Sequence, residues 1–248
     1  MGIHTTDAIV LRQYPYRETS VLVTCLTDRF GKLKGLVKGL RDQTRPRYRS
    51  AMEPLTLNRI VFYDTRTSSL HLISQCDLLA PFSALQRELE VTRTAAFCAE
   101  LADVALEVDD PQPQVFELLR DTLTRLMYAA SLPSVRIQFI LRLLKLSGFQ
   151  PQLDECTGCG VHPSLAALGT SQAGGFWSPR HGGLLCQRCL HEDPYAQPLG
   201  AEWLDAIEHC TDADHPVDLP AAQMDLMQRR LDEFLRYRLD RALNTMRV

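Results

Sequence analysis

The sequence predicts an α+β protein in which an N-terminal OB-fold β-barrel precedes a mainly α-helical domain with a four-cysteine zinc module. Three observations support this fold class: five strand-like segments within residues 1–80, helical periodicity from Pro81 onward, and two Cys-x-x-Cys pairs in the C-terminal half. The predicted domains are therefore residues 1–80 and residues 81–248, and the metal-binding insert occupies about 153–193.

The first 80 residues contain five segments that are typical of strands: residues 7–14, 19–28, 32–39, 55–64 and 70–79. In the third segment, Leu33 and Val37 share one face, and three lysines alternate onto the other. This pattern predicts a half-buried strand with a basic outer face. Five strands in this length fit a small closed barrel of the OB type, and an open SH3-like barrel is the competing interpretation.

Beyond Pro81 the apolar residues recur at helical spacing. We expect helices at residues 81–107, 115–130 and 134–148, with Gly148 as a C-terminal stop, and a last amphipathic helix at residues 224–246.

Four of the eight cysteines form the pairs Cys156-x-x-Cys159 and Cys186-x-x-Cys189, which are separated by 26 residues. Two residues between thiols allow a tight turn that directs both sulfurs at one ion, and two such turns complete a tetrahedral shell that suits Zn²⁺. The separation exceeds the usual spacing of about 15–20 residues, which an inserted loop explains. A filled shell leaves no position for a reactive water, so the zinc is expected to be structural.

Other roles for this region remain open. Redox or regulatory thiols are one alternative, and a catalytic metal is another. His162, His181 and His191 lie close enough in sequence to substitute as ligands. Cys25 and Cys76 fall within apolar patterns and are expected to be buried as small hydrophobic residues.

Positive charge is concentrated in the N-terminal part. Residues 1–80 hold twelve Lys and Arg against seven Asp and Glu, whereas residues 81–248 hold fifteen against twenty-three. The candidate nucleic-acid-binding residues are Lys32, Lys34, Lys38, Arg41, Arg45, Arg47 and Arg49. Several cations on one strand and its following loop favour phosphate contact, and Tyr14, Tyr16, Phe30 and Tyr48 are candidates for base stacking.

Motifs of several enzyme classes are absent from the sequence. It contains no phosphate-binding Gly-x-x-x-x-Gly-Lys-Ser/Thr loop, no Gly-x-Ser-x-Gly and no His-Glu-x-x-His. We therefore expect a protein that is not an enzyme. There is also no apolar run of about 18 residues and no secretion leader, so we expect a cytoplasmic protein without a membrane span.

Four stretches of the sequence are distinctive. The barrel contains "AIVLRQYPYRETSVLVTCLT" and "GKLKGLVKG". The second domain contains "LLKLSGFQPQLDECTGCG" and "GGLLC", which are the most specific motifs. Through these motifs the chain resembles, over nearly its whole length, the bacterial RecO family of recombination mediators.

The resemblance implies an N-terminal OB-fold, a helical C-terminal domain and a zinc module. It also implies binding to single- and double-stranded DNA, annealing of complementary strands, and a complex with RecR that helps RecA replace single-strand-binding protein (SSB), with the protein at the nucleoid during repair. The family's motifs match this sequence at the four paired cysteines and at Lys32, Lys34 and Lys38, so the resemblance implies metal binding and DNA binding by these residues. The DNA-binding role of the arginines from Arg41 to Arg49 rests on their charge alone.

Three other classes compete with this interpretation. An OB-plus-zinc protein of transcription or translation would bind RNA instead of DNA. A metal-dependent nuclease would need an added divalent ion. A protein adaptor would use the basic patch to bind an acidic tail.

Overall fold

The computed structural model describes residues 2–41, 51–64, 69–162, 175–212, 217, 219–239 and 243–246. The chain forms two compact units, one of Met1–Leu132 with Leu243–Val248 and one of Pro133–Ala242. The expected boundary near residue 80 separates strands from helices along the chain, but the first compact unit also includes the first two long helices.

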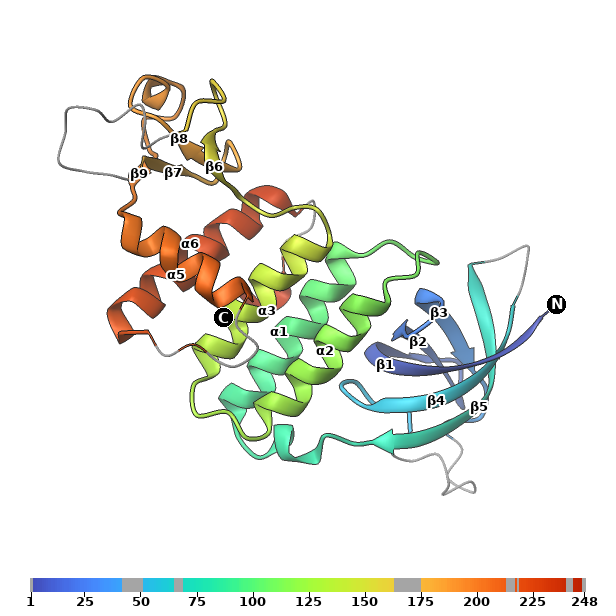
Figure 1. Cartoon of the computed structure of the whole chain (residues 1–248). Helices are drawn as coiled ribbons and strands as arrows, with labels where there is room; N and C mark the ends of the chain where they lie inside the picture. The colour runs from blue at the N-terminus through green and yellow to red at the C-terminus, as the bar shows by residue number, and fades with distance from the viewer. Residues whose placement is uncertain are drawn as a thin grey trace. The chain divides into compact units, whose positions relative to one another are not determined.

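In the described part of the first unit, five strands close into a barrel in the order β1-β2-β3-β5-β4 (Figure 1). Their bounds are Ile3–Tyr16 (β1), Ser20–Thr27 (β2), Gly31–Val37 (β3), Leu57–Tyr63 (β4) and Leu70–Ala80 (β5). All neighbouring pairs are antiparallel except β3 and β5, which run parallel and close the barrel. The predicted five-stranded OB-type barrel is confirmed.

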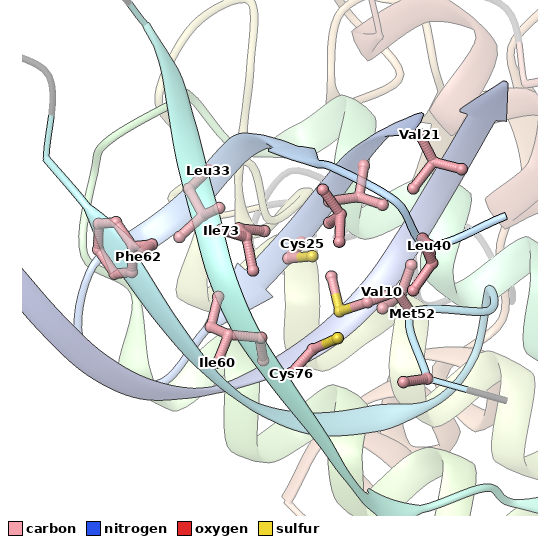
Figure 2. Close-up of a cluster of buried hydrophobic side chains, with 14 residues drawn as sticks. Val10, Val21, Cys25, Leu33, Leu40, Met52, Ile60, Phe62, Ile73 and Cys76 are labelled. Carbon is pink, nitrogen blue, oxygen red and sulfur yellow. The ribbon is translucent and has the colours of Figure 1, made fainter. Parts of the chain in front are cut away.

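The barrel interior is filled by inward-facing side chains from all five strands, together with Leu40, Ala51 and Met52 (Figure 2). On β2, Val21, Val23 and Cys25 point inward, and their exposed fractions are at most 2%. Each fully buried aliphatic or aromatic side chain stabilises the fold by about 1.5–3 kcal/mol. Cys76 is also buried here, so the prediction that Cys25 and Cys76 act as small hydrophobic residues is confirmed.

The described part of the first unit also contains the short 3-10 helix η2 (Ser83–Gln86) and two long α-helices. Helix α1 (Leu89–Ala105) buries an apolar stripe at helical spacing that includes Val91, Ala95 and Ala102. Helix α2 (Pro113–Leu126) begins with a proline at its first turn, where the missing N–H has no helical partner to lose.

Asp103 near the end of α1 binds two cations of the barrel. Its Oδ1 lies 3.2 Å from Nζ of Lys32, and its Oδ2 contacts Nε of Arg12. The Lys32 ammonium also donates to the carbonyl oxygen of Asp103. Lys32 is only 8% exposed, and a buried ammonium costs several kcal/mol unless it is paired. The contacts of Asp103 therefore fix α1 against the outer surface of the barrel.

The segment after α1 extends the edge of β3. Val108 forms a parallel bridge with Lys32, and the N–H of Asp109 donates to the Lys32 carbonyl at 2.8 Å. At Gly31 the backbone φ is +68°, and a Cβ atom would lie 1.9 Å from the Asp110 carbonyl oxygen, so only glycine fits. Since β5 pairs with β3 only from Lys34 onward, this segment satisfies the part of the β3 edge that β5 leaves open.

Among its described residues, the second unit has the α-helices α3 (Leu132–Leu146), α5 (Ala201–Asp212) and α6 (Ala221–Arg238). The stop predicted for α3 is confirmed, because Gly148 has a φ of +73° and the N–H of Phe149 closes the helix onto the Leu144 carbonyl. Helix α5 was not predicted from the sequence. In the described residues, no helix has the length and apolarity of a membrane span.

The predicted last helix over residues 224–246 is wrong at its C-terminal end. Helix α6 stops at Arg238, and Leu239 has extended backbone. Leu243 is buried and belongs to the first unit, where the N–H and hydroxyl of Thr245 donate to Glu100 of α1 at 2.9 and 2.7 Å. The apolar periodicity therefore continues beyond the end of α6 into a segment that finishes in a short 3-10 helix, η4 (Asn244–Met246).

The cysteine-rich module of the second unit has a small sheet in the order β6-β8-β7-β9 (Figure 1). Its strands are Gln152–Cys156 (β6), Phe176–Ser178 (β7), Gly183–Leu185 (β8) and Gln197–Pro198 (β9). Trp177 of β7 is fully buried and packs against Trp203 of α5 and Phe234 of α6, with ring centroids 5.2 and 5.5 Å away. This aromatic contact joins the module to the helices of the same unit.

We expect Asp103→Asn to destabilise the protein by about 3 kcal/mol, because it leaves the buried Lys32 ammonium without its counter-charge. Glu90→Gln on the same helix is the matched control, since the exposed pair of Glu90 with Arg93 contributes only about 0.5 kcal/mol. Urea unfolding followed by circular dichroism measures both changes. Equal, small effects would show that the contacts of Asp103 do not hold α1 to the barrel.

Candidate metal centre and nucleic-acid interface

The four paired thiols meet at one point of the second unit. The Sγ atoms of Cys156, Cys159, Cys186 and Cys189 all lie within 4.8 Å of one another. The Sγ atoms of Cys159 and Cys186 are 3.7 Å apart, which matches the separation of about 3.8 Å expected for two thiolates at 2.3 Å from a tetrahedral zinc ion. The predicted metal-binding cluster is therefore assembled by the fold.

Backbone hydrogen bonds shape the two turns that carry these thiols. In the first turn, the N–H of Gly160 donates to the Cys156 carbonyl at 2.8 Å, and in the second the N–H of Cys189 donates to the Cys186 carbonyl at 3.0 Å. The Cys186 N–H donates to Sγ of Cys156 at 3.2 Å. The turns also pack closely, because a Cβ on Gly158 would lie 3.1 Å from Sγ of Cys189.

The cluster favours negative charge on sulfur at one position. Burial opposes ionisation of Cys186, but the N–H groups of Cys189 and Arg188 and the neighbouring thiols outweigh it and lower its pKa to about 6. Burial and the neighbouring thiols raise the pKa of Cys189. Away from the cluster, burial raises the pKa of Cys76 to about 11. A metal that replaces the thiol protons would stabilise the cluster as thiolates.

Four sulfur donors suit a soft or borderline ion and fill a tetrahedral shell without a water position. Two of the three histidines considered from the sequence make other contacts in the structure. Nδ1 of His181 lies 2.9 Å from the Ser178 hydroxyl, and Nδ1 of His191 lies 2.8 Å from the Arg188 carbonyl. The residues present therefore fit a structural metal ion held by cysteines.

On the barrel, outward-facing apolar side chains form a row across all five strands, which we call the outer row. The strand register aligns one residue from each strand in the order Tyr14, Leu22, Leu36, Leu72 and Tyr63. Tyr14 is 54% exposed, and the other four are partly exposed. Aromatic and aliphatic side chains at such outward-facing positions can contact the faces of unpaired bases.

Exposed cations lie beside the outer row. Lys34 shares a face of β3 with Leu36, and Lys38 and Arg41 follow β3. Arg17, in the turn between β1 and β2, lies with its guanidinium 5.2 Å from the Tyr16 ring centroid. All four cations are exposed, and none of them forms an ion pair with a described residue.

The structure divides the seven predicted nucleic-acid-binding residues into three groups. Lys34, Lys38 and Arg41 lie at the exposed surface as expected. Lys32 has the expected parity, but it is buried beneath α1 with its ammonium on Asp103, so it lies outside the candidate interface. Arg45, Arg47 and Arg49 lie outside the described residues, as does Tyr48.

Sequence reasoning identified Tyr14 and Tyr16 but missed the outer row and Arg17. Alternation within each strand places Leu22, Leu36 and Leu72 on outer faces, yet only the register between strands brings them into line. Phe30, a predicted stacking residue, instead packs against the barrel core and Phe62.

We expect Cys159→Ala to lose the bound metal and to lower the unfolding temperature of the second unit, because three thiolates hold an ion poorly. Cys210→Ala is the matched control, since Cys210 is a buried thiol of the same unit outside the cluster. Elemental analysis and thermal unfolding provide the measurements. A full metal content in Cys159→Ala would contradict the assignment.

Comparison with known proteins identifies the family. Residues 1–82 match the family described as Recombination protein O N terminal, and residues 86–247 match Recombination protein O C terminal. The DNA repair protein RecO of Desulforudis audaxviator is 34% identical over 198 residues, covering 80% of this chain and 75% of the relative.

Other relatives with the same name agree over similar lengths. The protein from Myxococcus xanthus is 32% identical over 189 residues, which cover 76% of this chain and 73% of that relative. The protein from Geobacter metallireducens is 31% identical over 205 residues, which cover 83% and 79%. Together with the barrel, the helical second part and the four-cysteine cluster, these matches show that the chain belongs to the RecO family of DNA repair proteins.

Proposed function

We propose that this protein binds DNA through the outer row and the cations beside it. The single observation that supports this most strongly is the alignment of apolar side chains from five strands next to exposed Lys34 and Lys38. Aromatic and aliphatic side chains contact base faces, and cations contact phosphates. These side chains together can therefore bind both the bases and the phosphates of a single strand. The cations alone would also bind duplex DNA.

We propose further that the protein anneals complementary strands without covalent chemistry. Two strands repel each other, and cations that neutralise phosphates lower this barrier. A base on Tyr14 is held by about 1–3 kcal/mol, while each step of a new duplex gains about 1.4 kcal/mol. Because a duplex adds many such steps, paired bases can leave the outer row once register is found.

The family name of the relatives and the resemblance of the sequence support a role as a recombination mediator. In this proposal the protein acts with RecR at the bacterial nucleoid and helps RecA replace SSB on single-stranded DNA. The protein is not an enzyme in this scheme, and its contribution is to hold DNA strands. The cysteine cluster holds a structural Zn²⁺, which stabilises the second unit when bound.

We expect Lys34→Gln combined with Lys38→Gln to weaken DNA binding and to reduce the salt dependence. For single-stranded DNA, the slope of log affinity against log salt should fall by about 1.4, because each lost phosphate contact removes about 0.7. Arg59→Gln is the control, since Arg59 is exposed on β4 but pairs with Asp7. Fluorescence anisotropy at several salt concentrations measures the slopes. An unchanged slope in the double variant would place the interface elsewhere.

Tyr14→Ala tests the contribution of the outer row separately. We expect its affinity for single-stranded DNA to fall about 5- to 150-fold with an unchanged salt slope, because only base contact is lost. Affinity for duplex DNA, whose bases are stacked inside, should change little. Equal losses on both substrates would argue against base contact. Tighter binding to a matched RNA strand would favour the alternative of an RNA-binding protein.

The mediator function is tested by annealing. Complementary DNA strands coated with the cognate SSB are mixed with the protein without ATP at two salt concentrations. We expect annealing that slows at high salt and that Lys34→Gln with Lys38→Gln impairs. An absence of annealing with wild-type protein that still binds DNA would reject the annealing function while leaving DNA binding intact.

A further inference from the structure

A buried polar network lies next to the cysteine cluster. The Ser178 hydroxyl, which is fully buried on β7, donates to Oδ2 of Asp193 at 2.6 Å. Asp193 is 5% exposed, and its Oδ1 accepts from the N–H of Tyr195 at 3.2 Å. The Ser178 oxygen also accepts from the N–H of His181 at 3.2 Å and lies 2.9 Å from Nδ1 of the same residue.

The hydrogen-bond inventory fixes the roles within this network. A serine hydroxyl has one proton, and that of Ser178 points to the Asp193 carboxylate. Nδ1 of His181 must therefore be the donor to the Ser178 oxygen, so its hydrogen is on Nδ1. Nε2 of His181 faces Glu192, whose Oε2 is 3.8 Å away. Ser178 thus uses its donor and both acceptor positions within the module.

The network brackets the second cysteine turn. His181 precedes β8, which leads directly into Cys186, and Asp193 follows the short helix η3 (Leu190–Glu192) that begins after Cys189. By holding residues 181 and 193 together, Ser178 closes a loop that contains both cysteines of this turn. Closing the loop before metal arrives reduces the conformational entropy that binding must remove.

The arrangement differs from that of a Ser-His-Asp nucleophile. In a hydrolase the histidine lies between the serine and the carboxylate and takes the serine proton. Here the serine lies between the other two, and its proton is already directed at Asp193. Ser178 is also fully buried and cannot meet a substrate. These three side chains therefore hold the chain in place and do not carry out a reaction.

We propose that Ser178 and Asp193 are positioning residues for the metal ion. They hold Cys186 and Cys189 in the geometry that completes the four-sulfur shell. The inference rests on the metal ion of the proposed function. The first turn has its own support, because the N–H and hydroxyl of Thr157 both donate to the Leu184 carbonyl. Loss of Ser178 therefore loosens one half of the shell and leaves the other half supported.

The test is the zinc affinity of the full-length protein, measured by competition with a chelating indicator. We expect Ser178→Ala to bind Zn²⁺ about 10- to 100-fold more weakly than wild type, the range seen when groups that orient metal ligands are removed. Asp193→Asn keeps an oxygen that can accept from Ser178, so its loss should be smaller. Asp193→Asn also serves if Ser178→Ala does not fold.

The matched control is Ser134→Ala. Ser134 is a buried serine of the same unit whose hydroxyl donates to the Val217 carbonyl at 2.8 Å, and it lies on α3 outside the module. This variant should lose stability but keep wild-type zinc affinity. Wild-type zinc affinity in a folded Ser178→Ala would overturn the proposal.

A second measurement separates positioning from general stability. In the zinc-loaded protein, alkylation followed by mass spectrometry gives a rate for each cysteine. Relative to wild type, Ser178→Ala should speed alkylation of Cys186 and Cys189 more than that of Cys156 and Cys159, whereas uniform acceleration would overturn the inference. If wild-type protein binds no zinc, the proposed metal fails together with this inference, while DNA binding by the barrel stands or falls on its own measurements.

Discussion

The partly buried carboxylate of Asp103 is the contact on which the architecture of the first unit depends. It binds Lys32 and Arg12, two cations of the barrel, and so makes α1 part of the same body as the strands. The segment that follows then completes the open edge of β3 at Lys32. Because these contacts use the outer face of β3 up to Lys32, the face that remains accessible begins at Lys34. The same ion contacts therefore set one boundary of the candidate DNA interface.

In the second unit, the cysteine-rich module is small and has few residues to bury. Strand β7 supplies contacts on both of its faces. Phe176 packs against the cysteine cluster, while Trp177 packs against α5 and α6. Alternation along three residues thus joins a metal site to a helical core. The polar contacts of Ser178 add a third attachment from the same strand.

Local patterns in the sequence predicted the barrel, the helices α1, α2, α3 and α6 and the four-cysteine cluster, because strand alternation, helical periodicity and Cys-x-x-Cys spacing are short-range signals. Long-range contacts produced the errors. Lys32 has the parity of an exposed residue, yet it is buried and pairs with the carboxylate of Asp103, 71 residues further along the chain. The outer row depends on strand register, and the contact of Thr245 with Glu100 joins residues 145 positions apart, so neither is visible in a local window.

The aromatic contact between module and helices has a consequence for measurement. The chain has two tryptophans, Trp177 and Trp203, and both belong to this contact in the second unit. Intrinsic tryptophan fluorescence therefore reports on that unit alone, because the barrel contains no tryptophan. Comparing its transition with that of circular dichroism, which follows both units, separates the unfolding of the metal-binding unit from that of the barrel without any added label.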